Sequence, residues 1–186
     1  LASAVEIAKT HGITLTSIIF PRSQHNPAFA EVLRYYKIYC YRGIEPNWCY
    51  TTVQSRSLEI LQRGLRGIDY HMNVMGDKTV SWAETRDTDG LCNIRSSRFL
   101  RSFVPSRERL EALRFRRIRE SLEMASRKDK IFHLWWHPHN FGRYPEDNLA
   151  FLETILQAFD RLRRGKEFQS LSMRDAAEIS MAERDV

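Results

Sequence analysis

Apolar positions in the first forty residues change their period, which predicts alternating helices and strands. Residues 2–11 have helical spacing and end at a glycine, whereas Ile13–Phe20 is a β-branched run of strand length. Asn26 followed by Pro27 is a typical helix start, and the short run "KIYCYRG" then has the composition of a strand. Helix, strand, helix and strand joined by short links is the order of an α/β protein with a parallel sheet.

The middle of the chain is less regular. Apolar residues at helical spacing predict one helix there, at Leu58, Leu61, Leu65 and Ile68. Met75–Gly90 is polar and rich in turn residues. We therefore expect an irregular excursion from the sheet over about residues 43–105.

Regular alternation returns in the last third of the chain. Helical periodicity predicts a helix from about Ser106 to about residue 127 and another from about Pro145. Phe168–Ser172 is expected to be a short strand, and Ser172 with Asp175 forms the start signal of a final helix.

The predicted fold class is α/β, with helices outside one parallel sheet. Three runs are expected to be parallel strands of that sheet: Thr14–Phe20, Ile38–Tyr41 and Ile131–His137. A chain of 186 residues is long enough to bury a sizeable core, so residues 1–186 are expected to form a single domain.

Composition indicates a globular protein without a membrane span. Apolar residues make up 42% of the chain and charged residues 28%, and no segment approaches the roughly 18 uninterrupted apolar residues of a membrane helix. The first residues lack a methionine and a signal-peptide pattern, so we expect either a processed start or a piece of a longer protein. Three cysteines at spacings that match no zinc or redox motif favour a reducing compartment, and a cytoplasmic location is expected.

The net charge of +6 raises the question of a nucleic-acid partner. The two basic runs, Arg114–Glu120 and Arg161–Arg164, lie on amphipathic helical patterns. Glutamates interleaved with the arginines can pair with them, which favours solvated helix faces over a nucleic-acid surface. We therefore predict no nucleic-acid partner, and nucleic-acid binding is a third hypothesis that rests on charge alone.

The stretch "IFHLWWHPHNFG", Ile131–Gly142, is the richest in candidate chemistry. On a strand, His133 and His137 lie about 13 Å apart, too far to share a metal ion. His137 and His139, about 7 Å apart, could form a metal-binding pair, although the sequence offers no obvious third ligand. A buried core position is an alternative for His133, Trp135 and Trp136.

His137 is the preferred functional residue of this stretch. It stands at the carboxyl end of a predicted strand, and this edge of an α/β sheet is where ligands bind. An imidazole in such a place is a candidate acid or base. The loop "FPRSQHN" follows another strand and presents Arg22, Gln24 and His25 at the same edge, although a solvated loop arginine is an equal alternative for Arg22. We expect Arg22 and His137 to approach one shared cleft.

Four segments in this order resemble the polysaccharide deacetylases, a family of carbohydrate esterases, and specifically the nodulation-type deacetylase homologues associated with bacterial surface polysaccharides. The segments are "FPRSQHNPAFAEVL", "YRG", "SSRFLR" (Ser96–Arg101) and "HLWWHPHNFG" (His133–Gly142). The resemblance implies a deformed (β/α) barrel that removes acetyl groups from N-acetylated amino sugars with a divalent metal, usually zinc. It implies hydrolysis by a metal-bound water, with an aspartate as base.

The resemblance also implies roles for particular residues. His137 matches the late histidine that protonates the departing amine, and Arg22 matches the arginine that orients the aspartate base. Further residues of the two loops are expected to contact the substrate: Trp135, His139, Asn140, Gln24 and His25.

The early motifs of the family have no counterpart in the chain. These are an aspartate pair and a histidine pair that hold the metal. The chain therefore resembles the carboxyl-terminal portion of the catalytic domain, a partial barrel, and the zinc ligands are expected in an N-terminal segment that it lacks. No metal ligand is assigned here, and we expect the chain alone to bind no catalytic zinc and to release no acetate. Its expected partners are an amino-sugar polysaccharide and the missing segment, and a non-catalytic carbohydrate-binding protein of the same fold is the alternative.

Overall fold

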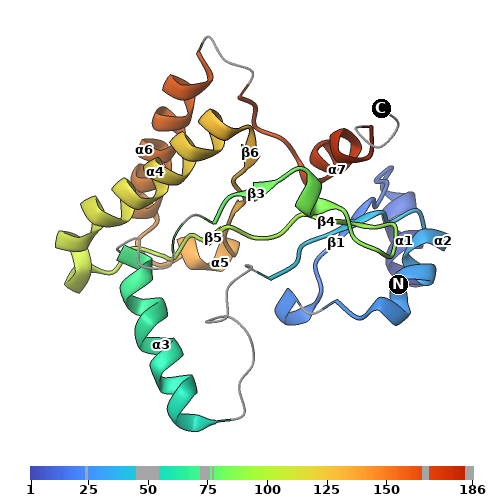
Figure 1. Cartoon of the computed structure of the whole chain (residues 1–186), viewed down its shortest axis with the longest axis horizontal. Helices are drawn as coiled ribbons and strands as arrows, with labels where there is room; N and C mark the ends of the chain where they lie inside the picture. Colours follow the sequence, from blue (N-terminus) through green and yellow to red (C-terminus); the bar gives the residue numbers. More distant parts are fainter. Residues whose placement is uncertain (24, 45–54, 72–75, 77, 165–167, 183–186) are drawn as a thin grey trace. The chain divides into compact units, whose positions relative to one another are not determined.

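The structure is a computed structural model that describes residues 1–23, 25–44, 55–71, 76, 78–164 and 168–182. It divides the chain into two compact units. The first unit comprises Leu1–Ile44, Val80–Arg95 and Ser170–Val186, and the second comprises Glu45–Thr79 and Ser96–Gln169. In both units the described elements are helices and small parallel sheets, so the protein is mixed α/β (Figure 1).

The first unit contains a three-stranded parallel sheet. Its strands are β1 (Ser17–Ile18), β2 (Cys40–Tyr41) and β4 (Cys92–Asn93), in the order β1-β2-β4. Both residues of β2 are buried because this central strand is covered on both faces. β3 (Val80–Ser81) and the short 3-10 helices η1 (Pro21–Ser23) and η4 (Ala83–Thr85) also belong to this unit.

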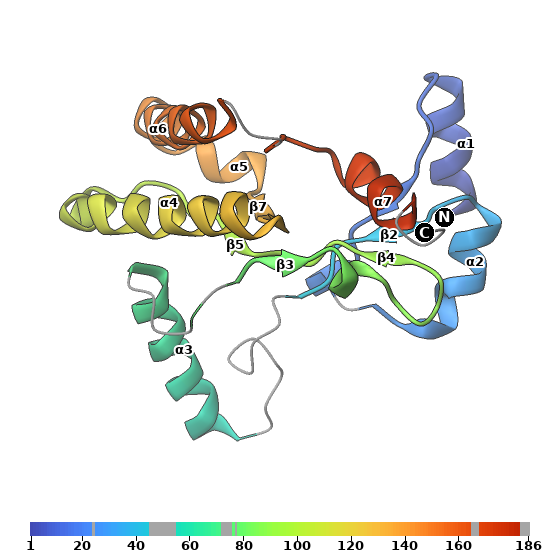
Figure 2. The same cartoon turned by 45° about the horizontal axis from the view of Figure 1, so that its top comes forward.

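Helices cover the two faces of this sheet. Successive strand residues point to opposite faces, so Tyr41 packs with Leu33 of α2 (Ala30–Tyr35), whereas Cys40 packs with Ala177 of α7 (Met173–Ala182). Figure 2 shows α7 lying against β2 and β4. The result is a three-layer arrangement within the first unit.

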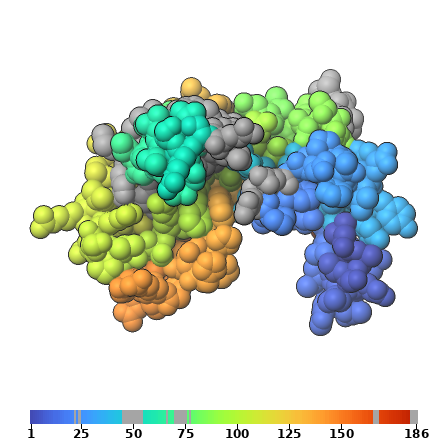
Figure 3. Space-filling view, turned by 90° about the horizontal axis from the view of Figure 1, so that it is seen from below, coloured from blue at the N-terminus to red at the C-terminus, as the bar shows by residue number. Residues whose placement is uncertain are grey.

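Local start signals place the helices of the first unit. Asn26 accepts a hydrogen bond from the Ala28 N–H at 3.0 Å, which begins the 3-10 helix η2 (Pro27–Phe29) that leads into α2. Ser172 and Asp175 bond each other's backbone N–H groups at the start of α7, as a capping box does. Helix α1 (Ala2–Thr10) has one buried residue and stands out from the rest of its unit in Figure 3.

The second unit is built on two long helices that pack side by side, α4 (Glu111–Lys128) and α6 (Pro145–Arg163) (Figure 1). Its hydrophobic core contains Ile118 and Leu122 of α4 and Ile155 of α6. These side chains pack with Leu100, which directly follows a strand. Beneath these helices, β5 (Arg98–Phe99) and β7 (Leu134–Trp135) form a parallel pair. The remaining elements are α3 (Arg56–His71), η5 (Pro105–Leu110), β6 (Lys130–Ile131) and α5 (Pro138–Phe141).

A buried carboxylate ties α3 to α4 in the second unit. Asp69 is 1% exposed, and its two oxygens lie 2.8 Å from Lys78 Nζ and 3.0 Å from Arg117 Nη2. Both cations are also buried. Burial and the neighbouring Arg98 lower the pKa of Arg117, and the Asp69 carboxylate opposes that shift. We call these three residues the Asp69 network.

The helices predicted from the sequence are confirmed, and the strands are shorter than predicted. The predicted strand Ile131–His137 is divided: it covers the last residue of β6 and all of β7, which are separated by two residues. β7 pairs with β5 instead of joining the sheet of β1 and β2 as predicted. The predicted strand Phe168–Ser172 is wrong, because Phe168 packs against Phe159 and the segment forms no strand. In the part of the chain that the structure describes, the sheets are open and no helix is long and apolar enough to cross a bilayer.

Candidate functional sites

His137 lies two residues beyond the end of a parallel strand, close to the strand end that the sequence predicted for it. β7 ends at Trp135, and His137 keeps an extended backbone (φ −97°, ψ 137°) as the residue before α5. Its N–H donates to Asn140 Oδ1 at 3.3 Å, and its carbonyl accepts from the Asn140 N–H at 2.9 Å. These two bonds fix the turn from strand to helix and leave the His137 imidazole exposed.

Four rings gather at this strand end, and we call them the aromatic cluster: Phe99, Trp135, His137 and His139. Phe99 and Trp135 are register partners on β5 and β7, so their rings meet across the strands with centroids 4.5 Å apart. His137 meets Trp135 edge-on at 5.3 Å and Phe99 at 5.9 Å. The cluster therefore presents two aromatic rings and two imidazoles within one small area.

The stacking of His137 on His139 does not favour a chelate between them. Their rings lie 5.1 Å apart with an interplanar angle of 13°. Imidazole lone pairs lie in the ring plane, so two nearly parallel stacked rings do not direct their nitrogens at a common ion. The arrangement suits a surface that contacts a ligand better than a two-histidine metal site.

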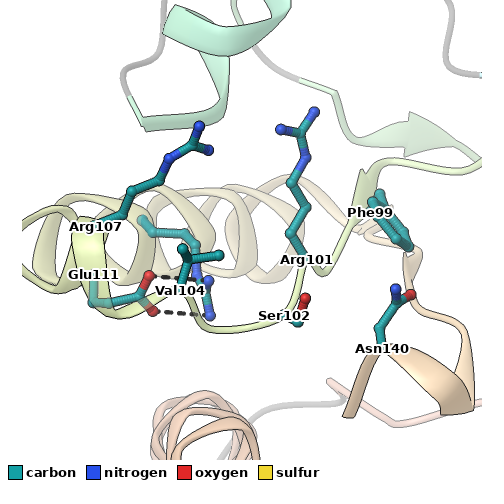
Figure 4. Close-up of a pocket in the computed structure, with 8 residues that line it drawn as sticks. Phe99, Arg101, Ser102, Val104, Arg107, Glu111 and Asn140 are labelled. Carbon is teal, nitrogen blue, oxygen red and sulfur yellow. Dashed lines mark hydrogen bonds and ion pairs between the residues drawn. The ribbon is translucent and has the colours of Figure 1, made fainter. Parts of the chain in front are cut away.

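A pocket of about 230 Å³ lies beside the aromatic cluster and shares Phe99 with it. Asn140 lines it from α5, and Arg101 and Arg107 extend their guanidinium groups to the same side of it (Figure 4). One wall is closed by Glu111, which pairs with Arg114 at 3.0 Å. Burial raises the pKa of the Glu111 carboxyl, and Arg114 partly offsets that rise.

The residues predicted in the loop after β1 are described only in part. The backbone of Arg22 lies in η1, but its side chain and the whole of Gln24 lie outside the described residues. His25 is described, and its side chain is 10% exposed. Its ring packs against Tyr41 at 4.2 Å and Phe20 at 5.4 Å, so it points toward the sheet and not into solvent.

A tight turn between η4 and β4 brings two aspartates to His25. The Asp87 N–H donates to the Leu91 carbonyl, the Gly90 N–H donates to the Asp87 carbonyl, and Gly90 has a φ of +72° that favours glycine. Asp87 Oδ1 accepts from the Thr88 N–H at 2.8 Å. The turn thus holds Asp87 and Asp89 at one edge of the sheet.

We call His25, Asp87 and Asp89 the His–Asp cluster. Ligand atoms of the three side chains all lie within 4.8 Å of one another, and His25 Nε2 is 3.4 Å from Asp89 Oδ2. The Tyr41 hydroxyl donates to Asp87 Oδ2, and Arg34 donates to the Asp89 carbonyl. Burial and the hydrogen bond to Asp87 raise the pKa of Tyr41 above its usual range, so the phenol stays a donor at neutral pH.

The sequence prediction included His25 and missed its two carboxylate neighbours. Asp87 and Asp89 fall in the polar stretch that was expected to leave the sheet. The signal present in the sequence was "DTDG", two carboxylates one residue apart before a turn glycine. Glu111 was also missed, because only the fold places this helix start in a pocket wall.

Arg22 and His137 lie in different units, the first and the second. Each is described within its own unit, so the cleft that they were expected to share stays a prediction. The same holds for the contact of Trp135, His139 and Asn140 with a substrate.

Comparison with known proteins found no match among protein-family models, curated proteins or solved structures. Function is therefore inferred from the residues of the chain and their geometry.

Proposed function

We propose that this chain is part of a metal-dependent deacetylase that acts on N-acetylated amino sugars of a bacterial surface polysaccharide, with His137 as the general acid. The observation that carries the proposal is the exposed imidazole at the carboxyl end of β7, next to aromatic rings and a pocket. The resemblance of the two loops to polysaccharide deacetylases supplies the reaction.

Amide hydrolysis needs a proton for the departing amine, and imidazole is the commonest side chain in that role. Two hydrogen bonds between His137 and Asn140 engage backbone groups of His137, and its imidazole is exposed to solvent. A divalent ion, zinc by the resemblance, would supply an activated water. Arg22 would orient the aspartate base in the same reaction.

The surroundings of His137 suit a polysaccharide. Aromatic rings offer broad apolar faces, and Trp135 with Phe99 provides two of them beside the imidazole. Arg101 and Arg107 bring positive charge to the adjoining pocket, which would favour acidic groups on the same polymer. Substrate contacts of His139, Asn140, Gln24 and His25 belong to this proposal, as does the partial (β/α) barrel, completed by an N-terminal segment of the same protein.

Two buried thiols accord with a reducing compartment, and we place the protein in the cytoplasm. Cys40 and Cys92 are register partners on β2 and β4, and both side chains are buried. Burial raises the pKa of Cys40 to about 12, so its thiolate is scarce and the thiol is inert near neutral pH.

The test is the His137→Ala variant of the complete gene product, assayed for acetate release from an N-acetylated amino-sugar oligosaccharide. Loss of a general acid is expected to lower the rate by about 10²-fold to 10⁴-fold while metal content is unchanged. The matched control is His11→Ala, which removes an exposed imidazole at the end of α1. No acetate release from the unaltered protein would contradict the proposal, and loss of metal in the His137 variant would make this residue a ligand instead.

The aromatic cluster also favours a second candidate, a carbohydrate-binding protein without catalysis. Aromatic rings such as Phe99 and Trp135 can bind a sugar through their faces and need no metal. Glycan binding that is unaffected by salt and by His137→Ala, weakened about 10-fold by Trp135→Ala and unaccompanied by acetate release, would select this candidate.

A further inference from the structure

We infer that His25, Asp87 and Asp89 bind a divalent transition-metal ion of the zinc type in the first unit. The inference does not rest on the deacetylase proposal, whose general acid is His137 in the second unit. No metal ligand was assigned to this chain from its sequence, and the three residues are brought together only by the fold.

The distances suit an ion with little rearrangement. Zinc binds imidazole nitrogen and carboxylate oxygen at about 2.0 to 2.2 Å, which places tetrahedral ligand atoms about 3.3 to 3.6 Å apart. His25 Nε2 and Asp89 Oδ2 already lie 3.4 Å apart, and all three ligand atoms lie within 4.8 Å. A shift of about 1 Å at Asp87 would complete the set, a small change for a short side chain on a turn.

The ring of His25 is buried, and its Nε2 lies beside a carboxylate of the cluster. Its side chain is nine-tenths buried, and its Nδ1 has no hydrogen-bond partner among the residues that the structure describes. Buried polar atoms are nearly always satisfied, so such a ring requires an explanation. An ion on Nε2, the nitrogen beside Asp89, would fix the tautomer that carries its proton on Nδ1, as is common for metal-bound histidine.

The charge balance points the same way. Two carboxylates face each other, and no Lys or Arg among the described residues forms an ion pair with either of them. Arg34 bonds the Asp89 backbone carbonyl, and the Tyr41 hydroxyl donates to Asp87 without bringing charge. A divalent cation would offset both carboxylates at once.

The donor set selects the class of ion. One imidazole with two carboxylates suits zinc or manganese, whereas calcium prefers six to eight oxygen ligands. Three protein ligands leave a fourth position for water, as in catalytic zinc sites. Tyr41 would act on the ion indirectly, because its hydroxyl holds the oxygen of Asp87 and so orients that ligand.

The experiment measures zinc binding to the metal-free 186-residue chain by calorimetry, together with the visible absorption of bound Co²⁺. We expect one zinc per chain and a Co²⁺ spectrum of low coordination number. His25→Ala and Asp89→Asn should each weaken zinc binding by more than about 10-fold. The matched control is the double variant His137→Ala, His139→Ala, which removes two imidazoles and should bind zinc as the unaltered chain does.

Each outcome supports or overturns the inference. No zinc binding and no Co²⁺ spectrum would show that His25 and Asp89 form a simple ion pair. Zinc binding that is lost in the His137, His139 double variant and retained in the other two would place the ion at the aromatic cluster. Circular dichroism melting of each variant checks that a loss of binding is not a loss of folding. Because binding is measured without acetate release, this inference and the deacetylase proposal can each fail alone.

Discussion

Two carboxylate-containing clusters among the described residues differ in how their charge is balanced. Asp69 in the second unit is 1% exposed, and two buried cations hold its oxygens at 2.8 and 3.0 Å. Asp89 in the first unit is 24% exposed, and its ion-pair partner among the described residues is His25 at 3.4 Å. The Asp69 network carries a surplus of positive charge, whereas the His–Asp cluster has two carboxylates and one imidazole.

This difference separates a structural site from a binding site. A buried carboxylate that is fully paired by its own chain has no room and no charge left for a ligand. A cluster that gathers carboxylates at a partly exposed turn lacks that compensation, and an external cation can supply it. The predictions that follow compare the effect of losing one carboxylate from each cluster.

The largest loss of stability is expected for Asp69→Asn. The substitution keeps the shape of the side chain but leaves Lys78 and Arg117 buried without their counter-charge. Breaking a buried ion pair by removing one partner costs about 3 to 5 kcal/mol, and the free energy of unfolding should fall by that amount. Urea denaturation followed by circular dichroism measures it.

The matched control is Glu59→Gln, which removes a carboxylate from the same helix. Glu59 pairs with Arg63 at 2.7 Å on the exposed side of α3, where an ion pair contributes little. The urea concentration at the midpoint of unfolding of Glu59→Gln should stay close to that of the unaltered chain. Equal losses in the two variants would show that the Asp69 network is no stronger than a surface pair.

Local sequence signals predicted the helices. They did not predict the strands that form only because they pair with residues far away in the sequence. Asn26 with Pro27 and Ser172 with Asp175 cap helices through neighbours three residues away or fewer, so the sequence alone carries this information. β4 and β5 have two residues each, too few to show a period. They are strands because β2 and β7 lie beside them, and nothing in their own composition specifies that.

The candidate sites show the same limit. The placement of His137 near a strand end and before Pro138 follows from adjacent residues, although β7 ends two residues earlier than predicted. The meeting of Phe99 with Trp135 depends on the register of two strands, which the sequence does not specify. His25 and Asp89 are 64 residues apart, so their contact could be found only once the turn and the sheet were placed.

A smaller effect, about 1 kcal/mol at neutral pH, is expected for Tyr41→Phe, which removes the hydroxyl that bonds Asp87. The size of this effect depends on pH. Because the folded-state pKa of Tyr41 is raised above 10.0, folding disfavours its ionised form. The resulting stability is complete below about pH 10 and falls as the pH rises further.

Denaturation at about pH 7 and about pH 11 tests this behaviour. The unaltered chain should lose more stability between these two values than Tyr41→Phe does, so the gap between them should narrow at high pH. If the difference in stability between the unaltered chain and Tyr41→Phe is the same at both pH values, Tyr41 ionises equally well in the folded and unfolded chains.

The smallest effect is expected for Asp89→Asn in the absence of metal, and its direction should be opposite to that of Asp69→Asn. The substitution removes one of two facing carboxylates, and relief of such repulsion at a partly exposed site contributes about 0.5 kcal/mol. Added zinc should make the unaltered chain more stable than Asp89→Asn. At a zinc concentration about 100 times the dissociation constant, binding would stabilise the unaltered chain by about 2.7 kcal/mol and the variant by much less. If Asp89→Asn instead destabilises the metal-free chain as Asp69→Asn does, the His–Asp cluster is a structural ion pair and the distinction between the two carboxylate clusters is wrong.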